Sequence, residues 1–298
     1  QSFEENRKFL GFIKECPTSY QTVNTLKKIF DEAGFVQKEE WEYGFWNKDD
    51  AFGSHDGEYK GYVIRNDSSI IAFRVPACKS PKGFKIVCSH TDSPMFKFKD
   101  NGEYGNSDTC LKLDVEKYGG MLMAPWFDRP LSVAGRVIIR RNGGLKEKLI
   151  NIKRDLVMIP NLAIHMNREA NNGVSYNPQK DLQPLFAVGN TDRTLLEIIA
   201  EQTGVKKEDI ISHDLFLYNR MPGTVWGADR EFVSSARLDD LQCAFTSMKG
   251  FLVAENEQNI NVYACFDNEE VGSGTKQGAA STFLYDVLWR VNKALGKG

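Results

Sequence analysis

The sequence predicts an α/β protein with a mostly parallel sheet that is flanked by helices and interrupted by an inserted β-rich unit. Three observations support this: a helical repeat of apolar residues near the N-terminus, apolar β-branched segments after it, and an alternation of helix and strand towards the C-terminus. A chain of 298 residues is long enough for two interleaved domains. We expect one domain from residues 1–95 and 232–298 and an inserted domain from residues 96–231.

The first forty residues predict two helices, because their apolar side chains recur at spacings of three and four residues. Gly34 ends the second of these helices. Residues 61–76 and 84–90 follow as two apolar segments rich in β-branched residues, with a turn at Asn66 and Asp67. These segments predict strands.

The middle of the chain, from about residue 95 to 233, has short strand candidates separated by Gly, Pro and Asn, and only residues 191–204 predict a clear helix. After it come a helical face from Leu241 to Leu252, a buried strand at 259–266 and an amphipathic helix at 277–295. Helix, strand and helix in succession are typical of a mostly parallel sheet that is covered on both faces.

The composition argues against two classes of partner. Hydrophobic residues make up 41% and charged residues 26%, with a formal net charge of -2, so the sequence indicates no broad basic surface for nucleic acid and no membrane-spanning stretch. The six cysteines are scattered without CxxC pairs, which is typical of reduced thiols. The opening residues lack the features of a signal peptide, and we expect a cytoplasmic protein.

Polar residues that could carry chemistry stand at three places where an α/β sheet usually has its active site, past strand ends or at helix starts. The first is SHTDSP (89–94), where His90 could bind a metal and Asp92 could hydrogen-bond its other ring nitrogen. A surface turn with an aspartate cap is the alternative explanation.

The second place is SARLDDL (235–241), where Asp239 and Asp240 begin a helix. The helix dipole alone would explain such carboxylates, although a carboxylate bridging two metals would also be well placed there.

The third place is FDNEEVGS (266–273), in which Asp267, Glu269 and Glu270 follow an apolar strand. Three carboxylates within four residues are costly unless solvent or a cation neutralises them, so a hydrated loop and a metal or catalytic site are both open. The glycine-rich residues after them lack the Walker spacing, which argues against a nucleotide site. Together, one histidine and several carboxylates on three segments suit a two-metal hydrolase, with zinc as the favoured ion and one carboxylate free to accept a proton.

In this order, the motifs SHTDSP, SARLDDL and FDNEEVGS resemble the diagnostic motifs of the M18 aminopeptidases, the group that includes aspartyl aminopeptidase. Further matches are WFDRPLSVAGRV (126–137), IPNLAIHMNRE (159–169) and QGAAS (277–281), so the resemblance covers almost the whole chain. It implies a zinc-peptidase fold of the phosphorylase/hydrolase-like kind for the catalytic domain and a dimerisation role for the inserted domain.

The resemblance also implies a role for each residue of the predicted site. His90 would bind one metal with Asp92 orienting it, Asp239 would bridge both metals, Glu270 would bind the second, and Glu269 would be the general base. The cofactor would be two zinc ions per subunit, with cobalt or manganese as alternatives.

His165 lies in the inserted domain, and by resemblance it would reach the active site of a neighbouring subunit to support the substrate or the tetrahedral intermediate. A buried histidine with a structural role is the alternative. The implied assembly is a homo-oligomer, a dodecameric shell built from dimers, that admits peptide substrates.

Two departures from the family pattern have consequences. Asp240 stands where the family usually has asparagine. Family members also continue with a further aspartate ligand, a further histidine ligand and much of the substrate pocket, whereas Asp286 is the only acid after Glu270 here and no histidine follows. We therefore expect a fragment that binds zinc weakly and is inactive or nearly so.

The predicted function is that of a metalloprotease which hydrolyses the N-terminal residue, Asp or Glu, from peptides. A neutral or broad-specificity aminopeptidase and a non-catalytic homologue are the alternatives. A deacylase or carboxypeptidase with the same catalytic core is a further one, but the matches at WFDRP and NLAIHM disfavour it.

Overall fold

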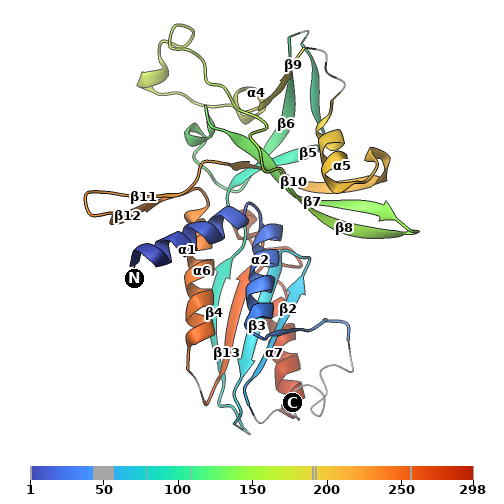
Figure 1. Cartoon of the computed structure of the whole chain (residues 1–298), viewed down its shortest axis with the longest axis vertical. Coiled ribbons are helices and arrows are strands. Elements are labelled where there is room, and N and C mark those ends of the chain that lie inside the picture. Colours follow the sequence, from blue (N-terminus) through green and yellow to red (C-terminus); the bar gives the residue numbers. More distant parts are fainter. Residues whose placement is uncertain are drawn as a thin grey trace. The chain divides into compact units, whose positions relative to one another are not determined.

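Figure 1 shows the computed structural model, which describes residues 2–42, 57–78, 80–107, 109–189, 191, 193–255 and 257–297. The chain divides into two compact units, the first made of Gln1–Ser93 and Thr224–Gly298 and the second of Pro94–Gly223. Residues 224–231, which the prediction assigned to the inserted domain, belong to the first unit. There β11 (Thr224–Trp226) pairs with β12 (Phe232–Ser234) in a hairpin.

The first unit contains a five-stranded sheet in the order β1-β2-β3-β13-β4. Its strands are β1 (Val36–Gln37), β2 (Tyr59–Arg65), β3 (Ser69–Val75), β4 (Phe84–His90) and β13 (Ile260–Phe266). β1 pairs with β2 and β13 pairs with β4 in parallel, whereas β2 pairs with β3 and β3 pairs with β13 in antiparallel. The described sheet is therefore mixed, and the prediction of a mostly parallel sheet is wrong.

The turn at Asn66 and Asp67 explains part of this difference. Both residues have left-handed backbone angles, with φ of 58° and 53°, and asparagine and aspartate tolerate this conformation best among residues with a side chain. The turn reverses the chain between Arg65 and Ser69, which are paired, and so makes β2 and β3 antiparallel. β4 then lies on the far side of β13, which separates it from β3.

Helices cover both faces of this sheet (Figure 1). They are α1 (Ser2–Glu15), α2 (Ser19–Glu32), α6 (Leu238–Val253) and α7 (Phe283–Ala294), and a short 3-10 helix, η5 (Glu269–Val271), follows β13. α1, α2 and α6 pack on the face that presents Tyr62 and Tyr263, and α7 packs on the face that presents Val262 and Ala264. All seven residues of β13 are buried between these layers. The predicted α/β architecture with flanking helices is confirmed.

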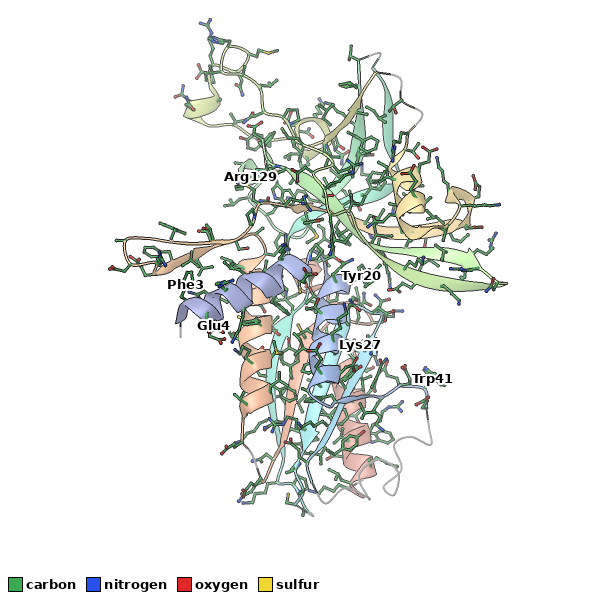
Figure 2. The ribbon with its side chains drawn as sticks, viewed as in Figure 1. Phe3, Glu4, Tyr20, Lys27, Trp41 and Arg129 are labelled. Carbon is green, nitrogen blue, oxygen red and sulfur yellow. The ribbon has the colours of Figure 1, made fainter. Side chains whose placement is uncertain are left out.

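Phe30 of α2 shows how the helices are held on the sheet. Its side chain is fully buried, and its ring centroid lies 5.1 to 6.2 Å from four other aromatic rings, those of Phe35, Tyr62, Phe251 and Tyr263. Aromatic pairs at such distances stabilise by about 0.5–1.5 kcal/mol each beyond the burial itself. At the rim of this cluster, Lys27, seen along α2 in Figure 2, donates a hydrogen bond to the Tyr62 hydroxyl at 2.7 Å.

The second unit contains a six-stranded antiparallel sheet in the order β8-β7-β10-β5-β6-β9. Its strands are β5 (Met95–Ser107), β6 (Cys110–Tyr118), β7 (Leu131–Arg141), β8 (Gly144–Asn151), β9 (Leu185–Val188) and β10 (Ile210–Asn219). Its helical segments are α4 (Pro178–Asp181), α5 (Leu195–Thr203), η2 (Ala124–Trp126), η3 (Ala170–Asn172) and η4 (Lys207–Asp209).

The helix predicted at residues 191–204 is α5, and local sequence explains both of its ends. Thr194 and Glu197 form a reciprocal capping box at its start, and Gly204 ends it with a left-handed φ of 66°. In either unit, no helix that the structure describes is long and apolar enough to span a lipid bilayer.

Candidate metal centre

Three segments of the first unit meet at one edge of its sheet. In the parallel pairing of β13 with β4, Phe266 lies opposite His90, the last residue of β4. Because the carboxyl ends of parallel strands lie at the same edge, the residues that follow these two strands come together. The start of α6 reaches the same place, since Oδ2 of Asp240 accepts the backbone N–H of His90 at 3.1 Å.

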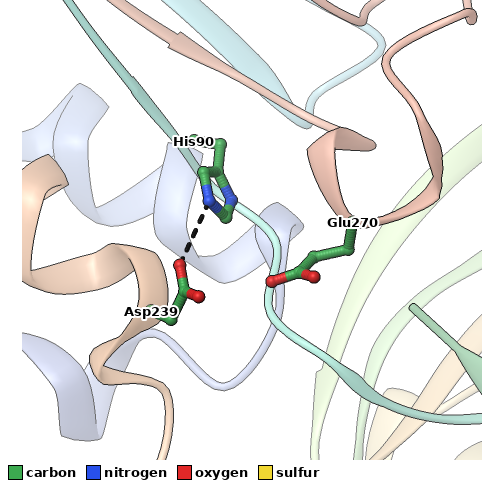
Figure 3. A group of neighbouring side chains, drawn as sticks. All are labelled: His90, Asp239 and Glu270. Atoms are coloured by element: carbon green, nitrogen blue, oxygen red, sulfur yellow. Dashed lines mark ion pairs between the residues drawn. The ribbon is translucent and has the colours of Figure 1, made fainter. Parts of the chain in front are cut away.

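His90, Asp239 and Glu270 each offer one ligand atom there, and these three atoms lie within 4.8 Å of one another. Nε2 of His90 and Oδ1 of Asp239 are 3.3 Å apart, and Figure 3 shows the Glu270 carboxylate directed towards this pair from η5. Zinc ligands lie about 2.0–2.2 Å from the ion, so two of them are at most about 4.4 Å apart. The three donors are therefore close enough to share one ion after a small movement of side chains, and close enough to hold two ions about 3.5–4 Å apart.

Asp92 orients the imidazole of His90. Nδ1 of His90 lies 3.1 Å from Oδ1 of Asp92, whose side chain is buried. The same carboxylate accepts the backbone N–H groups of Glu269 at 3.3 Å and Glu270 at 3.2 Å. A proton held on Nδ1 by this carboxylate leaves the lone pair of Nε2 for a cation, as is usual for histidine ligands.

Glu270 gives the clearest indication that a cation fits this place. Its Oε1 atom is buried and has no hydrogen-bond partner among the described residues. Burial, together with the negative charges of Asp239 and Asp92, raises the pKa of Glu270 to about 7. A divalent cation would satisfy the unpaired oxygen and reverse this unfavourable charge balance.

His90 responds to the same excess of negative charge. Burial alone would lower the pKa of His90, but the hydrogen bond to Asp92 and the charges of Asp92, Asp240 and Glu269 outweigh it and raise the pKa to about 9. A protonated imidazole cannot bind a metal, so a cation has to displace that proton. One nitrogen and two carboxylate oxygens are a donor set that zinc accepts.

Glu269 differs from Glu270 in its surroundings. Its side chain is 56% exposed, and its Oε2 lies 3.7 Å from Nε2 of His90. A carboxylate in this position is open to solvent beside the donors and is free to exchange protons.

Asp267, the third acid after β13, lies outside the donor group. Its side chain is buried, and burial and the nearby charge of Asp92 raise the pKa of Asp267 to about 7. Oδ1 of Asp267 accepts the backbone N–H of Asn268 at 2.8 Å. We call the residues that hold the donor residues in place without being donors the support of the centre, and Asp267 belongs to it.

Asn268 is a residue of this support that the sequence analysis missed. It has a left-handed φ of 63°, and its Oδ1 accepts hydrogen bonds from Thr275 at 2.8 Å and Gln277 at 2.7 Å. It thereby ties the glycine-rich segment to the start of η5. The signal in the sequence is an asparagine directly before two glutamates, since asparagine adopts left-handed backbone angles readily.

His165 belongs to the second unit and lies between Ile164 and Met166 on a stretch of exposed residues. The alternative explanation of a buried structural histidine is therefore wrong for this chain. Its predicted role at the site of a neighbouring subunit stays a prediction.

Comparison with known proteins gives this centre a family context. A family model described as aminopeptidase I zinc metalloprotease (M18) matches residues 12–298. A probable M18 family aminopeptidase 2 of Clostridium acetobutylicum is 44% identical over 300 residues, which cover 97% of this chain and 66% of that protein. The chain thus spans about two thirds of the length of the curated relatives that it matches.

Solved structures are similar over the same extent. Chaetomium thermophilum mApe1 matches with a TM-score of 0.89 at 26% identity, covering all of this chain and 69% of that one. The S. cerevesiae mApe1 dodecamer matches with a TM-score of 0.82 at 27% identity, covering 99% of this chain and 67% of that one.

Proposed function

Because this chain belongs to the aminopeptidase I zinc metalloprotease (M18) family, we propose that it is the metal-binding part of an aminopeptidase that removes N-terminal Asp or Glu from peptides. The observation that carries the proposal is the Glu270 carboxylate. Its buried Oε1 atom has no hydrogen-bond partner, and its side chain shares one donor group with His90 and Asp239. Burying an unsatisfied carboxylate is costly unless a cation completes it.

In this proposal two zinc ions are the cofactor, and cobalt or manganese could replace them. His90 and Glu270 would each hold one ion and Asp239 would bridge the two. Zinc, when bound, supplies a Lewis acid that polarises a carbonyl group and lowers the pKa of a bound water to about 7. One histidine and two carboxylates are fewer donors than two zinc ions normally take, so we expect slow hydrolysis by the chain alone.

Glu269 would act as the general base. Its exposed carboxylate accepts a proton from the attacking water and passes it to the nitrogen of the leaving amine as the C–N bond breaks. Asp92 would act through His90, by keeping the proton on Nδ1 and the ring in a fixed orientation.

His165 would complete the site of a neighbouring copy in a homo-oligomer, a dodecamer built from six dimers, through a dimerisation role of the second unit. Large apolar side chains surround His165 on its exposed loop, and such groups usually become buried in an assembly. The dodecameric relative from yeast supports this part of the proposal. The six cysteines, all among the described residues, are not paired with one another in disulfides, which supports a cytoplasmic location.

A neutral or broad-specificity aminopeptidase and a non-catalytic homologue are the alternatives. The Glu270 carboxylate argues against a non-catalytic homologue that has lost the metal site, because its unpaired buried oxygen would destabilise a fold that binds no metal. Substrate preference is best decided by experiment.

The test is hydrolysis of aspartyl-, glutamyl- and leucyl-p-nitroanilide by the purified chain, after metal removal and after addition of zinc, cobalt or manganese. We expect metal-dependent cleavage of the acidic substrates that is lost in Glu269→Gln. Glu208→Gln, which neutralises an exposed glutamate of the second unit, is the matched control and should keep full activity. Preference for the leucyl substrate would favour the neutral aminopeptidase. Absence of both hydrolysis and zinc binding would overturn the proposal.

A further inference from the structure

Asp239 and Asp240 are adjacent, yet their carboxylates have different surroundings. The side chain of Asp239 is 79% exposed, whereas that of Asp240 is 16% exposed. Both residues have non-helical backbone angles at the start of α6, with φ/ψ of -85°/112° and -115°/22°. The two side chains therefore leave the backbone in different directions, one towards solvent and one towards β4.

Asp240 is in contact with His90 at two points. Its Oδ2 accepts the backbone N–H of His90 at 3.1 Å and lies 3.9 Å from Nε2 of the same residue. The thiol of Cys243, one turn along α6, also hydrogen-bonds to the Asp240 carboxylate. Close by, Oγ of Ser93 donates to the carbonyl oxygen of Asp239 at 2.8 Å. These contacts fasten the segment after β4 to the start of α6.

From these contacts we infer that Asp240 is a positioning residue, which fixes His90 from the backbone side and adds negative charge beside the cation without binding it. The inference rests on the proposed function, because it concerns the same metal centre. Oδ2 of Asp240 is already used by the His90 N–H, and its side chain is mostly covered. Asp239, by contrast, keeps its carboxylate open for a ligand role.

The physical basis is that His90 is held at both ends. Asp92 fixes the ring through Nδ1, and Asp240 fixes the backbone from which the ring projects. Groups that hold metal ligands in this way change metal affinity by about 10- to 100-fold when they are removed. A carboxylate also attracts a divalent cation more strongly than a neutral amide does, and partial shielding from solvent strengthens this attraction.

Two variants separate charge from hydrogen bonding. Asp240→Asn keeps the shape and an acceptor oxygen but removes the charge, and Asp240→Ala removes both. The matched control is Asp286→Asn. Asp286 lies on α7, which covers the other face of the sheet from α6, and it forms an ion pair with Arg65 of β2, so it has no contact with the donor group. Zinc affinity is measured by competition with a chromophoric chelator, and the electronic spectrum of bound cobalt reports the set of ligands.

We expect zinc affinity to fall about tenfold in Asp240→Asn and about 100-fold in Asp240→Ala, with no change in the control. The cobalt spectrum of Asp240→Asn should match the unmodified chain, because no ligand has been lost. Wild-type affinity in both Asp240 variants would overturn the inference. A cobalt spectrum altered in Asp240→Asn would overturn it too, by making Asp240 a ligand.

A second measurement works without metal and separates this inference from the proposed function. The chain has four histidines, so labelling histidine with nitrogen-15 gives only four backbone amide signals, and His90→Gln assigns one of them. In metal-free Asp240→Ala we expect the His90 amide to shift upfield and its hydrogen exchange to accelerate about tenfold, which corresponds to one lost hydrogen bond. An unmoved His90 signal overturns the inference. A moved signal in a chain that binds no zinc supports the positioning role and overturns the proposed function.

Discussion

Nδ1 of His90 and Oδ1 of Asp92 are 3.1 Å apart, and this contact joins the last residue of β4 to the second residue after it. The Asp92 carboxylate also accepts the backbone N–H groups of Glu269 and Glu270. A single buried side chain therefore orients the histidine donor and the two glutamates together. Asp92 therefore supports the candidate metal centre without being one of its three donors.

Replacing Asp92 should weaken zinc binding without unfolding the chain. In Asp92→Asn the amide oxygen can still accept one of the two backbone N–H groups of Glu269 and Glu270, whereas the NH2 group can accept neither, and the neutral side chain cannot stabilise a proton on Nδ1 of His90 as a carboxylate does. We expect zinc affinity to fall about 10- to 100-fold, measured by chelator competition. Asp31→Asn is a suitable control, since Asp31 accepts a hydrogen bond from the Tyr62 hydroxyl. Equal affinity in Asp92→Asn and the control would contradict the role given to Asp92.

Zinc binding should release protons near neutral pH. The pKa of His90 is raised to about 9 and that of Glu270 to about 7, so near pH 7 the first is protonated and the second is half protonated. Both must lose their protons to act as ligands, which gives about one and a half protons in all when the centre is filled. Calorimetry in buffers with different heats of ionisation measures this number. Glu270→Gln should lower it by about half a proton; binding heats that do not depend on the buffer would count against these assignments.

The metal-free chain should lose stability as the pH rises. The folded pKa values of Asp267, Glu270 and His90 all lie above their ordinary values. The folded state therefore binds more protons than the unfolded state. Their contribution to stability is fully present below the ordinary pKa values and is lost as the pH rises through the folded ones. Urea unfolding with a chelator present, from about pH 5 to about pH 9, measures this loss.

Asp267→Asn should remove the part of this loss that falls between the ordinary pKa of aspartate, 3.8, and about 7. The effect should be on the order of 2–4 kcal/mol, because the carboxyl group is buried and one pKa unit corresponds to about 1.4 kcal/mol. The same pH dependence in the variant as in the unmodified chain would show that Asp267 does not titrate in this range.

The core of the first unit should be sensitive at Phe30. Phe30→Ala removes a fully buried ring in contact with aromatic residues of α6 and the sheet, and we expect it to cost about 3–5 kcal/mol. Phe3→Ala, at the exposed start of α1 in Figure 2, should cost less than about 1 kcal/mol. Urea unfolding followed by tryptophan fluorescence compares the two. Similar losses would mean that exposure is a poor guide to stability here.

The loop around His165 should matter for assembly rather than for folding. Leu162, Ile164 and Met166 are exposed, so changing all three to serine removes apolar surface without emptying the core. We expect a smaller oligomer by light scattering after gel filtration, with unchanged circular dichroism. Val188→Ser, at another exposed apolar position, on β9, is the control. An unchanged mass in the triple variant would contradict the proposed role of this loop.

Much of the fold follows from local patterns in the sequence. β13 was predicted as a buried apolar strand at residues 259–266, and α5 as the clear helix at residues 191–204. The direction of pairing was not predicted correctly. The sequence indicates the turn at Asn66 and Asp67, which makes β2 and β3 antiparallel. The helix, strand and helix order of the last residues nevertheless favoured a mostly parallel sheet.

The site was predictable in its donors but not in its supports. His90, Asp239 and Glu270 stand at strand or helix ends that sequence can locate, and the structure brings them together. The contacts of Asp240 and Asn268 depend on backbone angles that depart from helix and strand. Such angles arise from tertiary packing, and residue spacing does not encode them.

The place of β13 in the sheet has a consequence for synthesis. This strand lies between β3 and β4, although the whole second unit separates it from them along the chain. A ribosome therefore releases β3 and β4, then all of residues 94–223, and only afterwards the strand that joins the first two. The second unit, a continuous stretch, has all its strands available before that moment, whereas pairing between distant segments is slow. Because Asp239 and Glu270 follow the second unit along the chain, the donor group of the candidate metal centre is brought together only after residues 94–223 have been synthesised.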